Sequence, residues 1–315
     1  MSNPSRRDFL ARSAAIAGTS AFGMESLLTA QAADDVKPAD MTIARWEKPE
    51  ALTAEQIRSA AVKLTEAAIE GLGGLKRFVS KGDVVWVKAN IGWDRSPEQA
   101  ANTNPDVVAT IVRLCFDAGA KTVKVGDNPC DLARNTYQNS GIAAAVAPLG
   151  AEVVFLDSRR FRDTDIKGER VKSIPIYPAI IDCDLVINVP IVKHHGLATL
   201  TMCMRNYMGV IDNRKSFHQA IPTCLADLTR YMKPRLCVLD AVRTLAAHGP
   251  KGGNLADVQV KGTVAAGTDI VALDAWGAEL MGKKPAEIGS VAKGHEVGLG
   301  TIDYRSLNLK ELTVS

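Results

Sequence analysis

The chain has 315 residues, of which 46% are hydrophobic and 23% are charged. This composition excludes a disordered chain, which has too few apolar residues to form a core, and a protein of many membrane spans, which has fewer charges. The net charge is only +3, so the composition predicts no nucleic-acid partner. The length allows one large domain or two ordinary ones.

The N-terminus has the pattern of a twin-arginine export signal. Arg6 and Arg7 precede an apolar run over residues 14–28, and an Ala-Gln-Ala sequence ends at Ala32. That order is typical of a signal peptide, with an amphipathic helix as the alternative. We therefore expect residues 1–32 to be removed, the twin-arginine machinery to be a partner and the mature protein to be periplasmic. The apolar run is short for a spanning helix, so no membrane span is expected after cleavage.

The six cysteines are widely separated along the chain. No C-x-x-C motif occurs, which argues against an iron-sulfur cluster, a zinc ribbon or a thioredoxin-type pair. Cys115 and Cys237 lie within apolar stretches and are expected to be buried. One disulfide among the other four is left open, because spacing does not determine pairing. These are Cys130, Cys183, Cys203 and Cys224.

The residues after the signal predict an α/β fold, with a mostly parallel sheet and flanking helices. Residues 33–52 are mixed in composition and punctuated by proline, which favours a linker or an arm lying on the domain. The α/β body follows over residues 53–315. It begins with Thr53 and Gln56, which form a capping box in front of an amphipathic helix.

Apolar strands and amphipathic helices alternate along this body. Short apolar runs predict buried strands, and helical periodicity predicts the segments between them. This alternation is the βαβ pattern of a parallel sheet, in which the loops at the carboxyl ends of the strands form the functional edge. The expected strands are 84–87, 122–125, 153–156, 185–190, 236–239 and 258–264, and the expected helices begin near 53, 105, 142, 225 and 270.

A polar segment interrupts this order between residues 157 and 183. We expect it to form a hairpin or a small insertion. We interpret it as a break between two α/β lobes that enclose a cleft. One continuous large sheet is the alternative.

The expected strands end in polar residues that do not belong in a core. In an open α/β sheet these loops converge outside the carboxyl edge, where a ligand binds. Cations and amides predominate among them, so a small anionic molecule is the expected ligand. The residues are Lys88 and Asn90, Asp127 and Asn128, Lys193, His194 and His195, and Asp240.

The sequence Lys193-His194-His195 has side chains suited to proton transfer. Histidine titrates near neutral pH and the pKa of a desolvated lysine falls toward that range, so Lys193 and His195 are the acid–base candidates. His194, His195 and His218 are candidate metal ligands, although adjacent histidines on an extended chain point to opposite sides. A histidine that only caps or hydrogen-bonds a loop is the alternative.

Arg205 and Asn206 form a second candidate cluster. A guanidinium and an amide in sequence are able to hold the same anion. The alternative is a structural segment in which Arg205 is solvated and the methionines at 202, 204 and 208 fill the core.

Together these motifs resemble the family known as domain of unknown function 362, over roughly residues 80–280. In that family a Lys-Asn pair stands shortly before a glycine. In this sequence the corresponding residues are Arg205, Asn206 and Gly209, so an arginine stands in place of the lysine. Some relatives carry an appended ferredoxin module, which associates the family with redox settings; this chain lacks the clustered cysteines and is expected to hold no iron-sulfur cluster. The likeness rests on Lys88-Ala89-Asn90, Asp127-Asn128-Pro129, Asn188-Val189-Pro190, Lys193-His194-His195, Arg205-Asn206-Tyr207-Met208-Gly209 and the segment from Asp269 to Asp274.

We therefore expect an exported enzyme that acts on a small anionic ligand through Lys193 and His195. The alternative is a periplasmic protein that binds a ligand, metal or cofactor, or a redox accessory protein with a partner protein, in which the same residues do no chemistry. The resemblance identifies a site and no reaction. The residues expected to hold the anion are Lys88, Asn90, Asp127, Asn128, His194, Arg205, Asn206 and Asp240.

Overall fold

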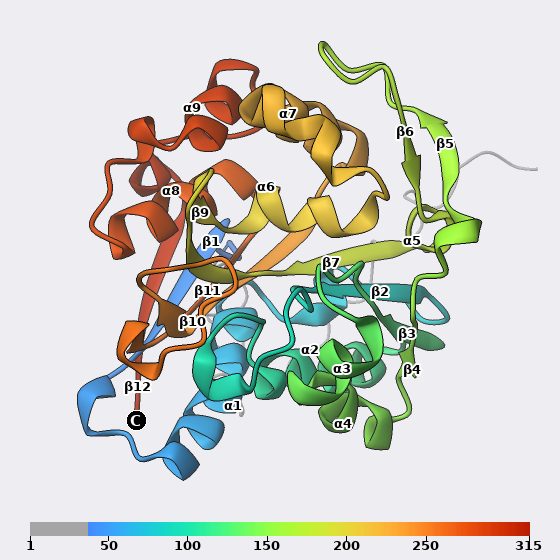
Figure 1. The fold of residues 1–315 in the computed structure, drawn as a ribbon. Helices are drawn as coiled ribbons and strands as arrows, with labels where there is room; N and C mark the ends of the chain where they lie inside the picture. Colours follow the sequence, from blue (N-terminus) through green and yellow to red (C-terminus); the bar gives the residue numbers. More distant parts are fainter. Residues whose placement is uncertain (1–36) are drawn as a thin grey trace, which may run out of the picture. The chain divides into compact units, whose positions relative to one another are not determined.

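A mostly parallel sheet lies at the centre of the computed structural model, which describes residues 37–315 (Figure 1). Within these residues its ten strands are β1 (Met41–Trp46), β2 (Val84–Ala89), β3 (Thr122–Val125), β4 (Glu152–Val153), β7 (Leu185–Val189), β8 (Ile191–His195), β9 (Thr199–Thr201), β10 (Leu236–Leu245), β11 (Val258–Gly267) and β12 (Leu309–Val314). Their order is β12-β1-β11-β10-β7-β2-β3-β4, with β8 beside β10 and β9 beside β8. From β10 to β4 all neighbours are parallel, whereas β11 is antiparallel to β1 and β10.

Helices cover both faces of this sheet (Figure 1). One layer consists of α1 (Ala54–Gly71), α2 (Pro105–Ala118), α3 (Ala133–Asn139) and α4 (Ile142–Val146). The opposite layer consists of α6 (Cys203–Asn206), α7 (Ile221–Met232), α8 (Ile270–Leu280) and α9 (Gly289–Glu296), and the short α5 (Pro178–Ile181) precedes β7. The predicted fold class, an α/β fold with a mostly parallel sheet between helices, is confirmed.

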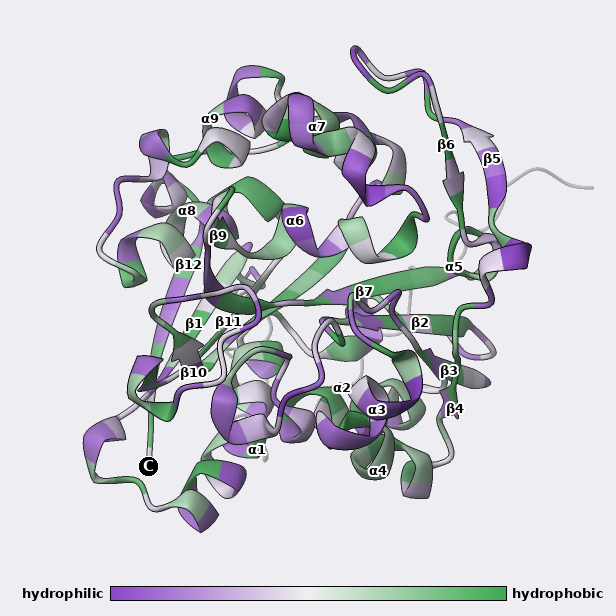
Figure 2. Cartoon of the chain, in the orientation of Figure 1, coloured by the Kyte–Doolittle hydropathy of each residue, from purple (hydrophilic) through white to green (hydrophobic). Residues whose placement is uncertain are grey.

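The sheet separates two hydrophobic cores because alternate residues of a strand point to opposite faces. On β2, Val85 and Val87 belong to the core under α1 and α2, and Trp86 belongs to the core under α6 and α8. All three are fully buried. Figure 2 shows the same distribution, with hydrophobic residues along the inner strands and hydrophilic ones on the outer surfaces of the helices.

Side-chain caps start the helices where the sequence predicted them. Thr53 Oγ1 accepts from the Gln56 backbone N–H at 3.3 Å, and Gln56 Oε1 accepts from the Thr53 N–H at 2.8 Å, which completes the capping box of α1. Asn104 caps α2, and Asp269 caps α8 by accepting from Ala272 N at 2.8 Å. Each cap satisfies a backbone donor that the helix itself leaves unpaired.

The polar segment between residues 157 and 183 does not divide the molecule into two lobes. It forms a separate antiparallel hairpin, β5 (Arg162–Asp165) and β6 (Ser173–Ile176), beside the main sheet. Residues 38–315 form one compact unit, and β7 pairs directly with β2 across the expected break. The single continuous sheet, which was the alternative, is therefore the fold that the structure has, with the segment as its insertion.

Part of the expected linker is a strand of the sheet. Within residues 33–52, Met41–Trp46 forms β1, which lies between β11 and β12 and pairs with both. Met41 and Ile43 face one core and Ala44 faces the other. The linker prediction was wrong here because six residues with a proline nearby give too short a pattern to separate a strand from an extended arm. The predicted signal, residues 1–32, lies outside the described residues.

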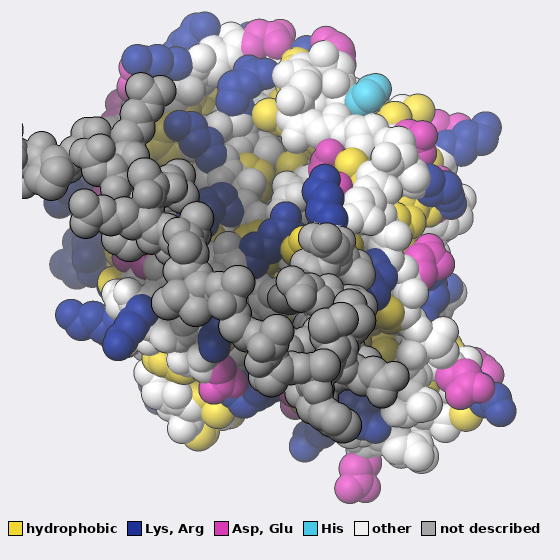
Figure 3. Space-filling model, turned by 180° about the vertical axis from the view of Figure 1, so that it is seen from behind, with side chains coloured by type: hydrophobic (Ala, Val, Ile, Leu, Met, Phe, Trp, Pro, Cys, Tyr) yellow, Lys and Arg dark blue, Asp and Glu magenta, His cyan; other side chains and the backbone are white. Residues whose placement is uncertain are grey.

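Cys115 and Cys237 are buried, as expected from their apolar neighbours. All six cysteines are free thiols, so none of them forms the disulfide that the sequence left open. Within residues 37–315, no helix is both long enough and apolar enough to cross a membrane. On the surface in Figure 3, lysine and arginine side chains are interspersed with aspartate and glutamate, in keeping with the small net charge.

Replacing Ile43 by alanine tests whether β1 is integral to the fold. Ile43 is fully buried between two paired strands, so we expect Ile43→Ala to lower the free energy of unfolding by about 2–5 kcal/mol. Urea denaturation measures this loss. Glu47→Ala, at an exposed residue just beyond the strand, is the matched control and changes stability by less than about 0.5 kcal/mol. Equal stability of the two variants would contradict the placement of β1.

Candidate functional site

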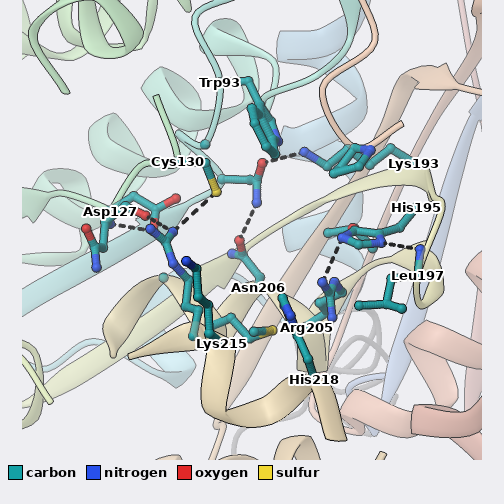
Figure 4. A pocket seen from close by; sticks show the side chains of 18 residues that line it. Trp93, Asp127, Cys130, Lys193, His195, Leu197, Arg205, Asn206, Lys215 and His218 are labelled. Atoms are coloured by element: carbon teal, nitrogen blue, oxygen red, sulfur yellow. Dashed lines mark hydrogen bonds between the residues drawn. The ribbon is translucent and has the colours of Figure 1, made fainter. Parts of the chain in front are cut away.

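A cavity of about 420 Å³ opens at the carboxyl ends of β2 and β3, where they meet β8 and α6 (Figure 4). The loops after the parallel strands reach it from one side, and the segment after α6 reaches it from the other. Eight of the eleven residues selected from the sequence line it: Asn90, Asp127, Asn128, Lys193, His195, Arg205, Asn206 and His218. Lys88 lies directly beneath it, whereas His194 and Asp240 lie elsewhere.

A buried ion pair forms the floor of this cavity. Lys88 Nζ lies 2.8 Å from Asp127 Oδ1, and the two side chains are 0% and 3% exposed. Burial lowers the pKa of Lys88, and the Asp127 carboxylate opposes that shift. Asp127 also accepts from the backbone N–H of Ile91 at 2.7 Å and of Asn128 at 2.8 Å. The pair therefore joins the loops that follow β2 and β3.

Gly209 is required by the close approach of this ion pair. A Cβ atom at residue 209 would lie 1.7 Å from Asp127 Oδ1 and 2.8 Å from Lys88 Nζ. Its carbonyl oxygen accepts from Asn128 N at 3.0 Å. Only glycine leaves room for the carboxylate at this position.

Asn206 connects the ion pair to the cavity wall. Its Oδ1 accepts from Lys88 Nζ at 3.3 Å and from Asn90 Nδ2 at 3.0 Å. Its Nδ2 donates to the Lys88 carbonyl at 2.9 Å and to Asn188 Oδ1 at 2.8 Å. All four hydrogen-bonding positions of this amide are used, so its orientation is fixed. Asn206 is therefore occupied in holding the site together.

Lys193 projects from β8 into the cavity and is only 1% exposed. Its ammonium donates to Asn90 Oδ1 at 2.9 Å and to the Ala101 carbonyl. Burial lowers the pKa of Lys193 to about 7, and the positive charges of Arg205 and Lys88 act in the same direction against Cys130 and Asp127. A lysine with this pKa exchanges a proton near neutral pH.

His195 and Arg205 face each other across the cavity. Arg205 Nη2 lies 2.7 Å from His195 Nε2, while His195 Nδ1 faces the backbone N–H groups of Leu197 at 3.1 Å and Ala198 at 3.2 Å. Burial first, and then the charges of Arg205 and Lys193, lower the pKa of His195 to about 3. The ring is therefore neutral at pH 7 and carries one proton, on the nitrogen facing Arg205 or on the nitrogen facing the backbone. Whichever nitrogen carries the proton, that N–H faces another donor, and the other nitrogen accepts.

Arg205 has no carboxylate partner among the described residues. Its Nη1 is buried without a hydrogen bond, and burial lowers the pKa of the guanidinium to about 10. The alternative of a solvated Arg205 is therefore not what the structure shows. The methionines on either side do fill the core, as that alternative expected, with Met202, Met204 and Met208 all buried.

The three candidate metal ligands do not converge. Lys193, His194 and His195 form part of β8 rather than a loop, so His194 points to the opposite side from its two neighbours. His194 Nδ1 accepts from Gly249 N at 3.0 Å. Within residues 37–315 no three His, Cys, Asp or Glu side chains are arranged to hold a metal ion.

Asp240 does not reach the cavity because β10 continues past it to Leu245. The prediction of a strand end at residue 239 was wrong, since Ala241 and Val242 continue the buried strand beyond a single carboxylate. Asp240 is fully buried and accepts from Asn104 N at 2.7 Å and Val242 N at 2.9 Å. Burial raises its pKa to about 6. Asp240 therefore supports the N-terminus of α2, because it accepts from the backbone of the helix cap Asn104.

Asp274 has a comparable supporting position under α6. Its carboxylate accepts from Cys203 N at 2.6 Å and Met204 N at 3.1 Å, the first residues of the helix that carries Arg205. Burial raises its pKa to about 7. The segment from Asp269 to Asp274, which belongs to the family resemblance, thus supports the site without lining the cavity.

Sequence reasoning missed several residues that line the cavity. Trp93 and Cys130 follow β2 and β3 in the same loops as Asn90 and Asp127, and extending each loop by three residues would have found them. Arg214 and Lys215 lie on a 3-10 helix, η7 (Arg214–Gln219), that follows no strand. Nothing in the strand pattern pointed to them.

Comparison with known proteins places these residues in a family. The family model described as "Domain of unknown function (DUF362)" matches residues 85–279. The chain belongs to this family. The match contains every residue that lines the cavity, from Asn90 to Pro250.

The chain is also similar to the thylakoid-associated protein sll1697 of Synechocystis sp. The two are 29% identical over 242 residues, which cover 73% of each chain. In this DUF362 protein the cation at residue 205, where the resemblance leads one to expect lysine, is an arginine that contacts His195. An arginine keeps the positive charge and adds a planar set of donors.

Proposed function

We propose that the cavity binds a small organic anion and that Lys193 exchanges a proton with it. The observation that carries this proposal is Arg205, a mostly buried guanidinium at the cavity wall without a carboxylate partner. Taking a charge out of water costs free energy unless an opposite charge or hydrogen bonds compensate it. A bound carboxylate or phosphate supplies both.

The contact between Arg205 and His195 supports the same ligand. A neutral imidazole cannot satisfy the two backbone donors at Nδ1 and the guanidinium at Nε2 together. With its proton on Nε2, His195 becomes a donor directed at the same region as Arg205. The two oxygens of a carboxylate or phosphate in the cavity then accept, one from the His195 ring and one from the Arg205 guanidinium, as in bidentate contacts.

Proton transfer falls to Lys193 in this proposal, and His195 becomes an anion-binding group. A base is most effective when its pKa lies near the working pH, which fits a pKa of about 7 for Lys193 and not one of about 3 for His195. When the anion binds, the neutral amine of Lys193 takes up a proton, and the ammonium so formed is able to pass that proton to the bound anion.

A carrier that binds the same anion without turnover is the second candidate function. It is favoured by Asn206, whose amide group is fully occupied by internal hydrogen bonds, so that this side chain has no group left to act on a ligand. An enzyme converts the bound acid, whereas a carrier or accessory protein returns it unchanged. Mass analysis of the ligand after incubation separates the two.

We also propose that the protein is exported by the twin-arginine route and works in the periplasm. The support is the order of Arg6, Arg7, the apolar run and the Ala-Gln-Ala sequence ending at Ala32. A chain folded before export passes through this route with its cavity already formed.

Replacing Arg205 tests anion binding directly. We expect Arg205→Ala to weaken the binding of benzoate and of inorganic phosphate at least about tenfold, because charged hydrogen bonds contribute about 1.5–3 kcal/mol each. Isothermal titration calorimetry on the full chain measures both dissociation constants. Arg159→Ala is the matched control, since Arg159 is exposed and pairs only with Asp157. Unchanged affinity in a folded Arg205→Ala protein would refute the anion site.

Proton uptake tests the role of Lys193. Its pKa of about 7 lies below the usual lysine value of 10.5, so the amine is mostly neutral at pH 8 in the free protein. A bound anion favours the charged form and raises this pKa. We therefore expect benzoate binding at pH 8 to take up close to one proton, measured by calorimetry in buffers of different ionisation enthalpy. Lys193→Met abolishes the uptake, and Lys121→Met, at an exposed residue before β3, does not. Uptake that persists in Lys193→Met would assign the proton to another group.

Lysine substitution of the arginine pair tests export. We expect the double variant Arg6→Lys and Arg7→Lys to accumulate as uncleaved precursor in the cytoplasm. Immunoblots of cytoplasmic and periplasmic fractions measure this, with Arg12→Lys as the control in the same segment. Undiminished mature protein in the periplasm of the double variant would show that the pair does not direct export.

A further inference from the structure

We propose that the natural ligand is an organic acid with at least two negative charges. This inference rests on the proposed anion site and specifies the class of molecule that fills it. It follows from the charge balance of the cavity lining and from the apolar surface that accompanies it.

The cavity lining holds four basic side chains, of which Lys193 is only partly charged near pH 7, and a single carboxylate. The cations are Lys193, Arg205, Arg214 and Lys215, and the carboxylate is Asp127. Asp127 is already paired with Lys88 below the floor, so it offsets little of the positive charge of the four. Like charges held together repel one another, more strongly where water is partly excluded. A monoanion offsets one of these charges and leaves an excess that a dianion or trianion reduces further.

The cations are held in place by different elements, so they act on one ligand from several sides. Lys193 belongs to β8 and Arg205 to α6. Arg214 begins η7, and its guanidinium donates to the carbonyls of Asn128 at 2.6 Å and Pro129 at 2.8 Å. These carbonyls orient Arg214 and leave its charge without a carboxylate partner.

Lys215 adds a positive charge that has no partner among residues 37–315. Its ammonium makes no hydrogen bond or ion pair within residues 37–315, and the residue is exposed at the cavity mouth. In Figure 4, Lys215 and His218 lie on the side of the cavity that carries Arg205, away from Trp93. A second negative group of a ligand held by Arg205 is therefore able to meet Lys215.

The remaining lining favours an organic body over an inorganic ion. Trp93, Leu197, Met208 and Pro250 contribute apolar surface between the cations. A volume of about 420 Å³ lies in the range of small-molecule sites and far exceeds the size of a phosphate ion. The combination fits an acid with several charged groups on an apolar or aromatic frame.

A matched series of aromatic acids tests this inference. Benzoate and the three benzenedicarboxylates share one frame and differ in the number and placement of charges. We expect the best of the three dicarboxylates to bind the full chain at least about tenfold more tightly than benzoate, in calorimetry at pH 7 and constant ionic strength. Equal affinity for benzoate and all three dicarboxylates would overturn the inference while leaving the proposed anion site in place. Binding of none of the four would overturn both.

Lys215→Gln locates the second charge. We expect it to remove most of the advantage of the dicarboxylate and to change benzoate binding less than about twofold. Lys121→Gln, an exposed lysine at the amino end of β3, is the control and changes neither. If Lys215→Gln weakened the binding of benzoate and of the dicarboxylate equally, Lys215 would only attract anions through its charge. That result would contradict a specific contact with the second carboxylate.

Discussion

The site depends on the buried ion pair between Lys88 and Asp127. Two charges shielded from water are stable only when each is fully compensated, and removing one partner of such a pair costs about 3–5 kcal/mol. Asp127 meets this condition with backbone donors from two loops, and Lys88 meets it with Asn206 and the Ala89 carbonyl. The pair therefore determines how closely the strand ends, α6 and Gly209 approach one another.

The cavity above this neutral ion pair carries a net positive charge. Lys88 on β2 and Lys193 on β8 are both buried lysines, and only Lys88 has a carboxylate partner. Lys193 is left with an amide and a carbonyl, which stabilise an ammonium less than an opposite charge does, so its pKa falls to about 7. Arg205, Arg214 and Lys215 likewise have no carboxylate partner in the described residues. The buried Lys88 is paired with a carboxylate, whereas the cationic side chains of the cavity lining are not. This arrangement is suited to binding an anionic ligand.

The supporting carboxylates show why the predicted site was only partly right. Asp240 and Asp274 resemble ligand-binding acids in sequence, yet both are fully buried and accept backbone N–H groups at the start of helices. Their protonated form is favoured by burial, with pKa values of about 6 and 7. A polar residue after an apolar run therefore marks either a ligand site or a structural support, and for Asp240 the length of β10 decides between them.

The sequence by itself determined the alternation of strands and helices, the capping box of α1, and the polar strand ends that gather around the cavity. These follow from local patterns: a period of two or of 3.6, a side chain within three residues of its N–H, and the parallel direction of βαβ units. The tertiary structure decided that β1 joins the sheet, that the chain forms one sheet and not two lobes, and that Asp240 lies at the start of α2 and not in the cavity. It also decided that Arg214 and Lys215 reach the cavity and that Lys193 lacks a carboxylate. Those outcomes depend on which distant segments meet, and no local pattern in the chain carries that information.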